Sequence, residues 1–193
     1  MGTSTELPLF PLGTVLFPGG PLPLRIFETR YVDMVRRSLR EQRGFGVLWI
    51  RSGREAGEVA QTASVGTSAR IVDFYQLPDG LLGLTCLGER KFRLLRRWQA
   101  SDGLNLGEVE WLAPEPSVPV PESLQHLALL LRAVLPQLGN LYEAVPRHFG
   151  DASWVSARIA EILPIELAEK QACLELDDGV QRLARLAPLI LRE

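Results

Sequence analysis

Histidine and cysteine are scarce in this chain, which has two residues of each among 193. Neither histidine lies in a His-x-x-x-His pattern and neither cysteine in a Cys-x-x-Cys pattern, so the sequence predicts no metal centre. Cys86 and Cys173 lie in a strand-like and a helix-like segment, so we expect no disulfide framework. Because disulfides belong to oxidising compartments, the expected location is the reducing cytoplasm.

Further absences narrow the classes of enzyme. No Gly-x-x-x-x-Gly-Lys-Ser/Thr segment occurs, which excludes ATP hydrolysis of the P-loop kind. The pair Gly44 and Gly46 lacks the third glycine of a dinucleotide-binding fingerprint. His126 lies in an apolar helical segment, and the carboxylates of Asp177 and Asp178 fall at a helix junction, where capping explains them. We therefore predict no catalytic residue, no cofactor and no enzymatic activity.

The net charge is small and the uninterrupted apolar runs are short. The net charge of −2 gives no global attraction to nucleic acid or anionic lipid. No stretch approaches the roughly 20 uninterrupted apolar residues of a membrane span, and the N-terminus has no basic region followed by an apolar signal core. With 46% hydrophobic and 23% charged residues, the composition is typical of a soluble globular protein.

Proline and glycine are instead concentrated in an apolar segment near the N-terminus, residues 7–31. Each proline fixes φ and removes a backbone donor, so neither a helix nor a central strand runs through the segment. Its glycines permit turns with positive φ. We predict very short strands over residues 9–12, 15–17 and 22–26, which wrap a small, strongly bent β-barrel.

The residues after this segment predict a helix, a loop, a hairpin turn and further strands. Thr29 is a plausible N-cap for a helix that reaches residue 42, and a polar, mobile loop is expected over 51–58. Residues 77–80, Leu-Pro-Asp-Gly, suit a hairpin turn. Strands are predicted before and after these turns, over residues 45–50, 65–75, 81–87, 90–98 and 106–112.

A proline-rich segment divides the chain, with four prolines in residues 113–121. Beyond it the apolar period changes from two to about 3.6, which predicts a compact helical region. The first helix, over 122–138, is apolar nearly all round and should be buried between the others. Three more helices are predicted over 153–163, 165–176 and 178–191. The fold class is α+β: a barrel over residues 1–113, a linker over 114–120 and a four-helix region over 121–193.

Several of these motifs strongly resemble the Lon N-terminal domain, the substrate-recognition module of ATP-dependent Lon proteases. The resemblance covers nearly the whole chain and is carried by Leu7-Pro-Leu-Phe-Pro-Leu12, Val15-Leu-Phe-Pro-Gly19, Pro23-Leu-Arg-Ile-Phe-Glu-Thr-Arg-Tyr31, Val65-Gly-Thr-Ser-Ala-Arg-Ile71, Leu77-Pro-Asp-Gly80 and Glu169-Lys-Gln-Ala-Cys-Leu-Glu175. It implies a PUA-like barrel that recognises unfolded or tagged protein segments. Full Lon proteases carry an ATPase module and a Ser-Lys protease module after this domain. The expectation is a solitary relative, adaptor or competitor in the cytoplasmic Lon system, without protease activity.

Candidate peptide contacts are the apolar residues at the proline-rich corners, Leu16, Phe17, Leu22 and Leu24. A groove at the junction of barrel and helices could hold such a segment. The alternative is that these four side chains form the barrel core.

Six other positions match the family motif and are expected to be structural: Pro11, Pro18, Gly19, Glu28, Arg30 and Tyr31. The prolines and the glycine shape the corners. Glu28, Arg30 and Tyr31 should lock the passage from strand to helix by a local ion pair and ring packing.

RNA binding is a second possibility, because PUA-like barrels elsewhere bind RNA and residues 89–98 are rich in arginine. Phe92 and Leu94 alternate with Lys91, Arg93 and Arg96, which predicts one buried face and one basic face. The candidate RNA contacts are Lys91, Arg93, Arg96 and Arg97. Four arginines of the first helix add to this charge. The other interpretation is an ordinary solvated face. A third possibility, an enzyme with an unrecognised pocket, requires convergent polar groups with perturbed pKa values in a deep cavity.

Overall fold

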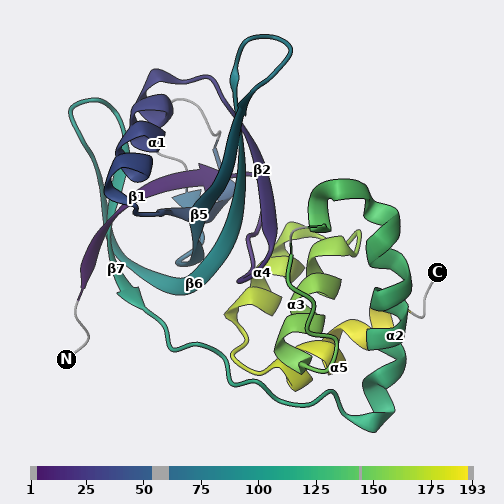
Figure 1. Cartoon of the computed structure of the whole chain (residues 1–193). Coiled ribbons are helices and arrows are strands. Elements are labelled where there is room, and N and C mark those ends of the chain that lie inside the picture. Colours follow the sequence, from purple (N-terminus) through teal and green to yellow (C-terminus); the bar gives the residue numbers. More distant parts are fainter. Residues whose placement is uncertain (1–3, 54–60, 144, 191–193) are drawn as a thin grey trace. The chain divides into compact units, whose positions relative to one another are not determined.

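The computed structural model describes residues 4–53, 61–143 and 145–190. The chain forms two compact units, residues 1–113 and 114–193 (Figure 1). The first unit is mostly β-structure and the second is helical, so the fold class is α+β as predicted. None of the helices, within the described ranges, is long and apolar enough to cross a membrane.

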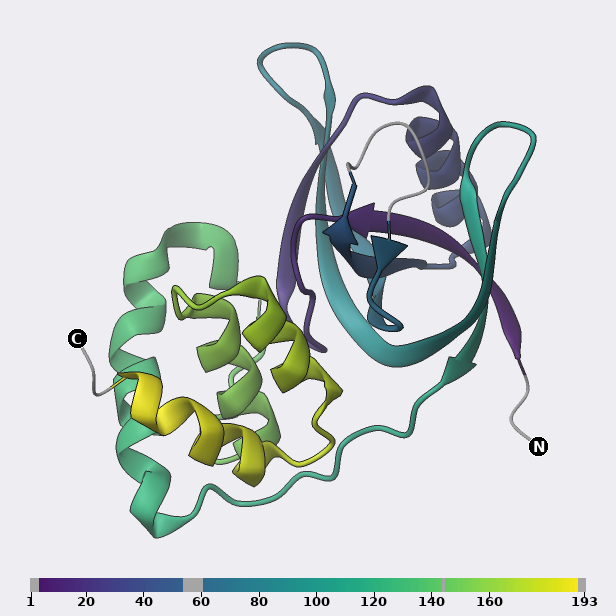
Figure 2. The ribbon, with the colours of Figure 1, turned by 180° about the vertical axis from the view of Figure 1, so that it is seen from behind.

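The first unit is a closed barrel. Around it, β1 is followed by β7, β6, β5 and β3, and β3 returns to β1. All these pairs are antiparallel except β1 with β3, and both ribbon views show the strands curling round (Figures 1 and 2). A further strand, β2, joins β6, and the short β4 joins β3. The bounds are β1 Thr5–Leu12, β2 Pro21–Ile26, β3 Phe45–Ser52, β4 Gln61–Thr62, β5 Val65–Gln76, β6 Leu82–Gln99 and β7 Asn105–Trp111.

Helix α1, Thr29–Glu41, packs one face into the barrel core. Tyr31, Met34 and Val35 are buried in one cluster with side chains of the strands. Glu28, one residue before the predicted Thr29, is the N-cap. The helix ends at Gln42, which takes the left-handed conformation with φ 51°.

The strands differ from the prediction in two places. Residues 15–17 form no strand, and residues 82–99 form one continuous β6 instead of two strands. A register shift against β5 near Gly88 lets β6 pass this point without ending. Most of the predicted mobile loop, residues 54–58 of 51–58, lies outside the described residues.

Among its described residues, the second unit holds four α-helices, which confirms the predicted helical region. The proline-rich segment before them is bound to this unit, because Val120 N–H donates to Gly150 C=O at 3.1 Å and Ala152 N–H donates to Val118 C=O at 2.8 Å. The bounds are η1 Glu122–Leu124, α2 Gln125–Val134, η2 Leu135–Tyr142, α3 Ala152–Ile162, α4 Leu167–Glu175 and α5 Gly179–Ile190.

The prediction that the first helix of this unit is buried on all sides is wrong. Leu127 and Leu131 are buried, but Leu129 is 64% exposed and Leu130 is 42% exposed. Apolar composition alone did not identify the covered face, since only one stripe of α2 contacts its unit. Two large polar side chains, Arg158 and Arg182, take places in the core instead.

Candidate functional site

The position of β2 follows from a turn that the sequence specifies. Gly20 N–H donates to Phe17 C=O at 3.0 Å, and Gly19 between them has φ 72°. Proline at the second and glycine at the third place of a turn favour type II geometry, because only glycine adopts that φ without strain. Gly19 N–H also donates to Gly88 C=O at 2.8 Å, so the turn is fastened to β6 directly before β2 begins.

A pocket of about 340 Å³, which we call the corner pocket, lies along one side of β2. Its walls come from the end of β1, from β2 and from the start of α1, and they are mainly apolar. The apolar side chains that line it include Phe10, Leu12, Leu22, Leu24, Phe27 and Tyr31.

A second pocket of about 470 Å³, the hairpin pocket, lies between β2 and the turn that joins β5 to β6. Tyr75 forms one wall because its ring lies over Gly83 of β6: a Cβ at Gly83 would be 2.4 Å from Tyr75 Cε2. The turn itself closes with Gly80 N–H donating to Leu77 C=O at 2.8 Å. Pro23, Leu24 and Arg25 line both pockets, so β2 is the ridge between them.

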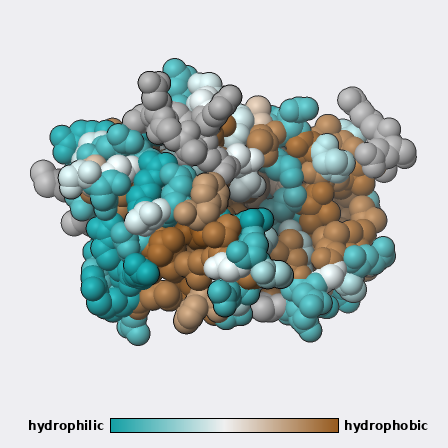
Figure 3. Space-filling view, turned by 90° about the horizontal axis from the view of Figure 1, so that it is seen from above, coloured by the Kyte–Doolittle hydropathy of each residue, from teal (hydrophilic) through white to brown (hydrophobic). Residues whose placement is uncertain are grey.

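Large apolar side chains are exposed at these pockets. Phe27, at the corner pocket, is 65% exposed, and Tyr75, at the hairpin pocket, is 42% exposed. Phe74, next to Tyr75 in β5, is 59% exposed. In the view from above, apolar side chains reach the surface among hydrophilic ones (Figure 3). Exposed apolar groups that adjoin a hollow are typical of an interaction site.

The charges around β2 are paired with one another. Arg25 forms an ion pair with Asp79 across the hairpin pocket. At the corner pocket, Arg30 Nη2 lies 2.8 Å from Glu28 Oε2, and Arg30 Nη1 donates to Gly103 C=O at 2.9 Å. The site therefore has apolar walls and no excess of charge of either sign.

An ion pair and ring contacts join the residues of the strand-to-helix corner. Besides its ion pair with Glu28, Arg30 lies over the Tyr31 ring at 4.7 Å, and that ring stacks on Phe10 with centroids 3.9 Å apart. Pro11 is buried in β1 opposite Leu48 of β3. Both Phe10 and Tyr31 line the corner pocket.

The four predicted peptide contacts lie in different places. Leu16 and Phe17 are buried and line neither pocket, so their side chains offer no surface to a peptide and we correct this part of the prediction. Leu22 is also buried, although it lines the corner pocket. Leu24 is half-buried and borders both pockets. The proline corners turn most of their apolar side chains inward, which hydrophobicity alone did not reveal.

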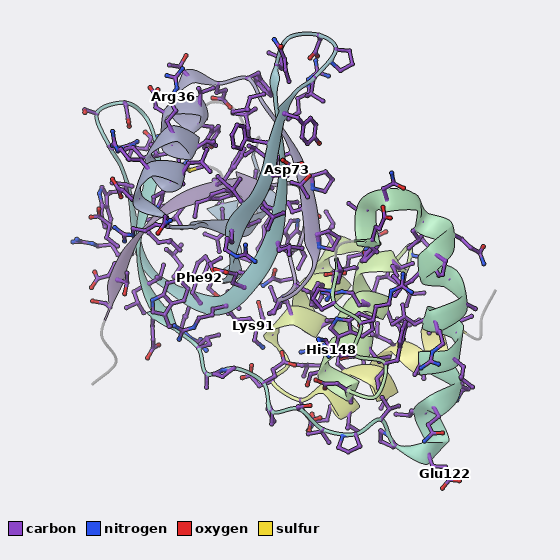
Figure 4. The ribbon with its side chains drawn as sticks, in the orientation of Figure 1. Arg36, Asp73, Lys91, Phe92, Glu122 and His148 are labelled. Carbon is purple, nitrogen blue, oxygen red and sulfur yellow. The ribbon has the colours of Figure 1, made fainter. Side chains whose placement is uncertain are left out.

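The predicted basic face of β6 is interrupted. Lys91 is only 4% exposed, beside the buried Phe92, and the two adjoin on β6 in Figure 4. Arg93 and Arg96 are exposed and Arg97 is half-buried. Alternation fails at Lys91 and Phe92, next to the register shift of β6 against β5 between Gly88 and Lys91, and again at Arg96, where the register of β6 against β7 shifts after Leu94.

Acidic side chains of β7 reduce the field of the exposed arginines. Arg93 lies opposite Glu110 in the ladder, and Arg96 Nε is 3.9 Å from Glu108 Oε2. On α1, Arg36 pairs with Asp33 and Arg37 with Asp102. Arg40 and Arg43 both lie within 4.0 Å of Glu41.

Two groups have strongly raised pKa values, and neither of them lines a pocket around β2. Burial raises the pKa of the Cys86 thiol to about 12. Burial and the nearby Glu161 carboxylate raise the pKa of the Tyr142 hydroxyl, which donates to Glu161 Oε2 at 3.2 Å. Among the described residues, no three His, Cys, Asp or Glu side chains gather as a metal site.

The raised pKa of Cys86 predicts a protected thiol. At pH 8 the native protein should react with a thiol reagent at least tenfold more slowly than the urea-unfolded protein, because both Cys86 and Cys173 are buried and protonated. The unfolded Cys86 thiol loses its proton at lower pH than the folded one, so its contribution to stability is lost as pH rises between 9 and about 12. Quenching the labelling reaction at fixed times and weighing the products by mass spectrometry measures the reaction rates of the native and the unfolded protein. Equal rates would contradict the burial of the two thiols.

The sequence analysis missed Phe27, Phe74, Tyr75 and Gly83. Two adjacent aromatics, Phe74 and Tyr75, shortly before the Pro-Asp-Gly turn were a usable signal, since such side chains at a hairpin end are seldom both core. Phe27, between β2 and α1, had no such signal. Gly83 had no local signal. Its importance arises only because Tyr75 crosses it from the neighbouring strand.

Comparisons with known proteins agree on one family. The family model described as the ATP-dependent protease La (LON) substrate-binding domain matches residues 6–192. The crystal structure of a Lon N-terminal domain protein from Xanthomonas campestris is 36% identical, with a TM-score of 0.79, and the match covers 95% of this chain and 98% of that one. The N-terminal domain of Mycobacterium avium complex Lon protease has a TM-score of 0.65 at 18% identity, covers 98% and 100% of the two chains, and shows the likeness of fold alone.

Curated relatives are longer proteins. Lon protease 2 of Myxococcus xanthus is 28% identical over 97% of this chain, and the match covers 24% of that protein. Protein cereblon of Gallus gallus is 31% identical over 65% of this chain and 28% of its own length. The chain thus spans about a quarter of the length of the curated relatives it matches.

Proposed function

Because the chain belongs to the family of ATP-dependent protease La (LON) substrate-binding domains, we propose that it recognises unfolded or tagged protein segments and has no enzymatic activity of its own. In this proposal it acts as an adaptor within the Lon system, and its place of action is the cytoplasm. The ATPase and protease activities of Lon are not proposed for this chain, since the matched domain is the substrate-binding one.

The observation that carries the proposal is the pair of pockets around β2. Leu24 is central to it because it borders both pockets, and Phe27 and Tyr75 add exposed aromatic surface on the two sides. Unfolded segments differ from folded proteins chiefly by their exposed apolar side chains. A hollow apolar surface without excess charge suits such ligands.

Client binding is measured by fluorescence anisotropy with a labelled protein that is reduced and carboxymethylated so that it cannot refold. We expect saturable binding that changes little between low and moderate salt. Phe27→Ser and Tyr75→Ser should each weaken binding by about tenfold, because aromatic anchors carry much of the affinity of an interface. The matched control is Leu95→Ser, which removes an apolar side chain of the same unit that is 53% exposed and lines neither pocket.

A labelled single-stranded RNA serves as the competing ligand. RNA binding that falls steeply with salt and is lost in Arg93→Ala would favour the basic strand over the pockets. Equal effects of Leu95→Ser and Tyr75→Ser on client binding would also count against the β2 site. Circular dichroism of each variant shows that it remains folded.

A further inference from the structure

The free edge of β2 bears on how a segment is held. Within the described residues, β2 pairs with β6 and with no other strand, so its second edge is unpaired. Unpaired edges often bind peptides by strand addition, in which the ligand continues the ladder of backbone hydrogen bonds. The donors on this edge decide whether that mode is available.

Two of the three outward donors are missing. Gly88 N–H donates to Gly20 C=O at 2.9 Å, and backbone direction alternates along a strand, so Leu22, Leu24 and Ile26 direct their N–H groups toward β6. Positions 21, 23 and 25 face the free edge. Proline occupies the first two, which leaves Arg25 as the one outward N–H donor of β2. An added strand would find acceptors there but few donors.

The backbone of β2 offers few donors to a ligand, but the side chains around it form two pockets. The two pockets lie on opposite sides of β2 and share Pro23, Leu24 and Arg25. Neighbouring strands are about 4.8 Å apart, so pockets one strand spacing to either side of β2 are roughly 10 Å apart. An extended chain in the polyproline II conformation has three residues per turn and rises about 3.1 Å per residue, so side chains three positions apart lie on one face about 9 Å apart, close to this distance.

The charges specify the character of the occupant. Arg25 is paired with Asp79, and Glu28 with Arg30, so the charged groups at both pockets are already compensated. A charged ligand would gain no unpaired partner there and would lose hydration. Complementarity therefore favours an uncharged segment with apolar or aromatic side chains.

We propose that an extended, uncharged protein segment crosses β2 and places two apolar side chains, three positions apart, into the corner and hairpin pockets, without adding a strand to β2. This inference rests on the proposed function, because it specifies how the same surface recognises a client.

The probe is a fluorescein-labelled ten-residue peptide of glycine and serine with two phenylalanines three positions apart. Replacing either phenylalanine with alanine should weaken binding about tenfold, and moving the two to adjacent positions should weaken it similarly. Ester replacement of the amides between them removes the N–H donors that an added strand would use. It should change the dissociation constant by less than about twofold.

The protein provides a matched control at Pro21, which faces the free edge but lines neither pocket. Pro21→Val restores an outward N–H, so it should strengthen binding if a strand is added and leave binding unchanged under the proposal. Loss of binding on ester replacement, or a gain with Pro21→Val, overturns the crossing mode. The crossing mode is also overturned if the unfolded client binds but the peptide does not bind. If neither ligand binds, the proposed function is overturned as well.

Discussion

Arg182→Met is expected to lower the free energy of unfolding of the helical unit by about 3–5 kcal/mol, the usual cost of removing one partner from a buried ion pair. Arg182 is 1% exposed. Its Nη2 donates to Glu115 Oε1 and to Leu176 C=O, both at 2.6 Å, and its Nε donates to Cys173 C=O at 2.7 Å. Methionine fills much of the volume but donates none of these three hydrogen bonds, so all of them are lost.

The partners of Arg182 explain why it tolerates burial. Cys173 and Leu176 lie at the end of α4, where carbonyl groups lack partners within the helix, and Glu115 belongs to the proline-rich segment. One guanidinium thus joins α4, α5 and the chain that enters the unit. Removing it should loosen all three.

Urea unfolding followed by circular dichroism at 222 nm measures the effect. The matched control is Arg185→Met, three residues along α5, which removes an exposed ion pair with Glu169 and should cost no more than about 1 kcal/mol. Equal losses in the two variants would contradict the account of Arg182 as a central link.

Gly88→Ala is expected to lower the free energy of unfolding of the barrel by about 2–3 kcal/mol, as overpacking does. A Cβ at Gly88 would lie 2.2 Å from Phe17 O and 3.1 Å from Phe17 C. Because these are backbone atoms, they cannot rotate away as a side chain end would. The turn before β2 must move, and the hydrogen bonds of Gly88 with Gly19 and Gly20 would be strained.

The displacement should also reach the pockets, because this turn sets the start of β2. We expect client binding to weaken by at least fivefold even where the variant is fully folded. Gly150→Ala is the control, since a Cβ there meets nothing within 4 Å and its φ is not positive. Unchanged stability and unchanged binding in Gly88→Ala would show that β2 does not depend on this contact.

Most of the helices and turns could be predicted from local sequence. Asp178 precedes α5 as expected, and its Oδ1 accepts from the N–H groups of Val180 at 2.8 Å and Gln181 at 3.0 Å. Helix α3 begins at Ala152, one residue before the predicted start at residue 153, and its cap is Asp151, which accepts from Ser153 N–H at 2.9 Å. Capping and turns depend on residues two or three positions apart, so their signals are present in short windows.

The candidate site was only partly predictable. Leu22 and Leu24 were identified from the segment over residues 7–31, which is rich in proline and glycine. Tyr75 lies near them because β2 pairs with β6 and β6 pairs with β5, and no local pattern reveals these pairings. The aromatic wall exists because Gly83 leaves space for the ring. Such a site depends on the register of three strands, and register is set by contacts between distant parts of the chain.

What the sequence determined by itself was the α+β class, the change from barrel to helices and the sharp turns such as Pro18-Gly19, since proline and glycine restrict φ wherever they stand. Tertiary structure decided which apolar residues are covered. It buried Lys91 beside Phe92 and left Leu129 at the surface of α2. It also closed the barrel by the parallel pairing of β1 with β3. Burial and closure depend on partners remote in sequence, so residue type and local period alone do not define them.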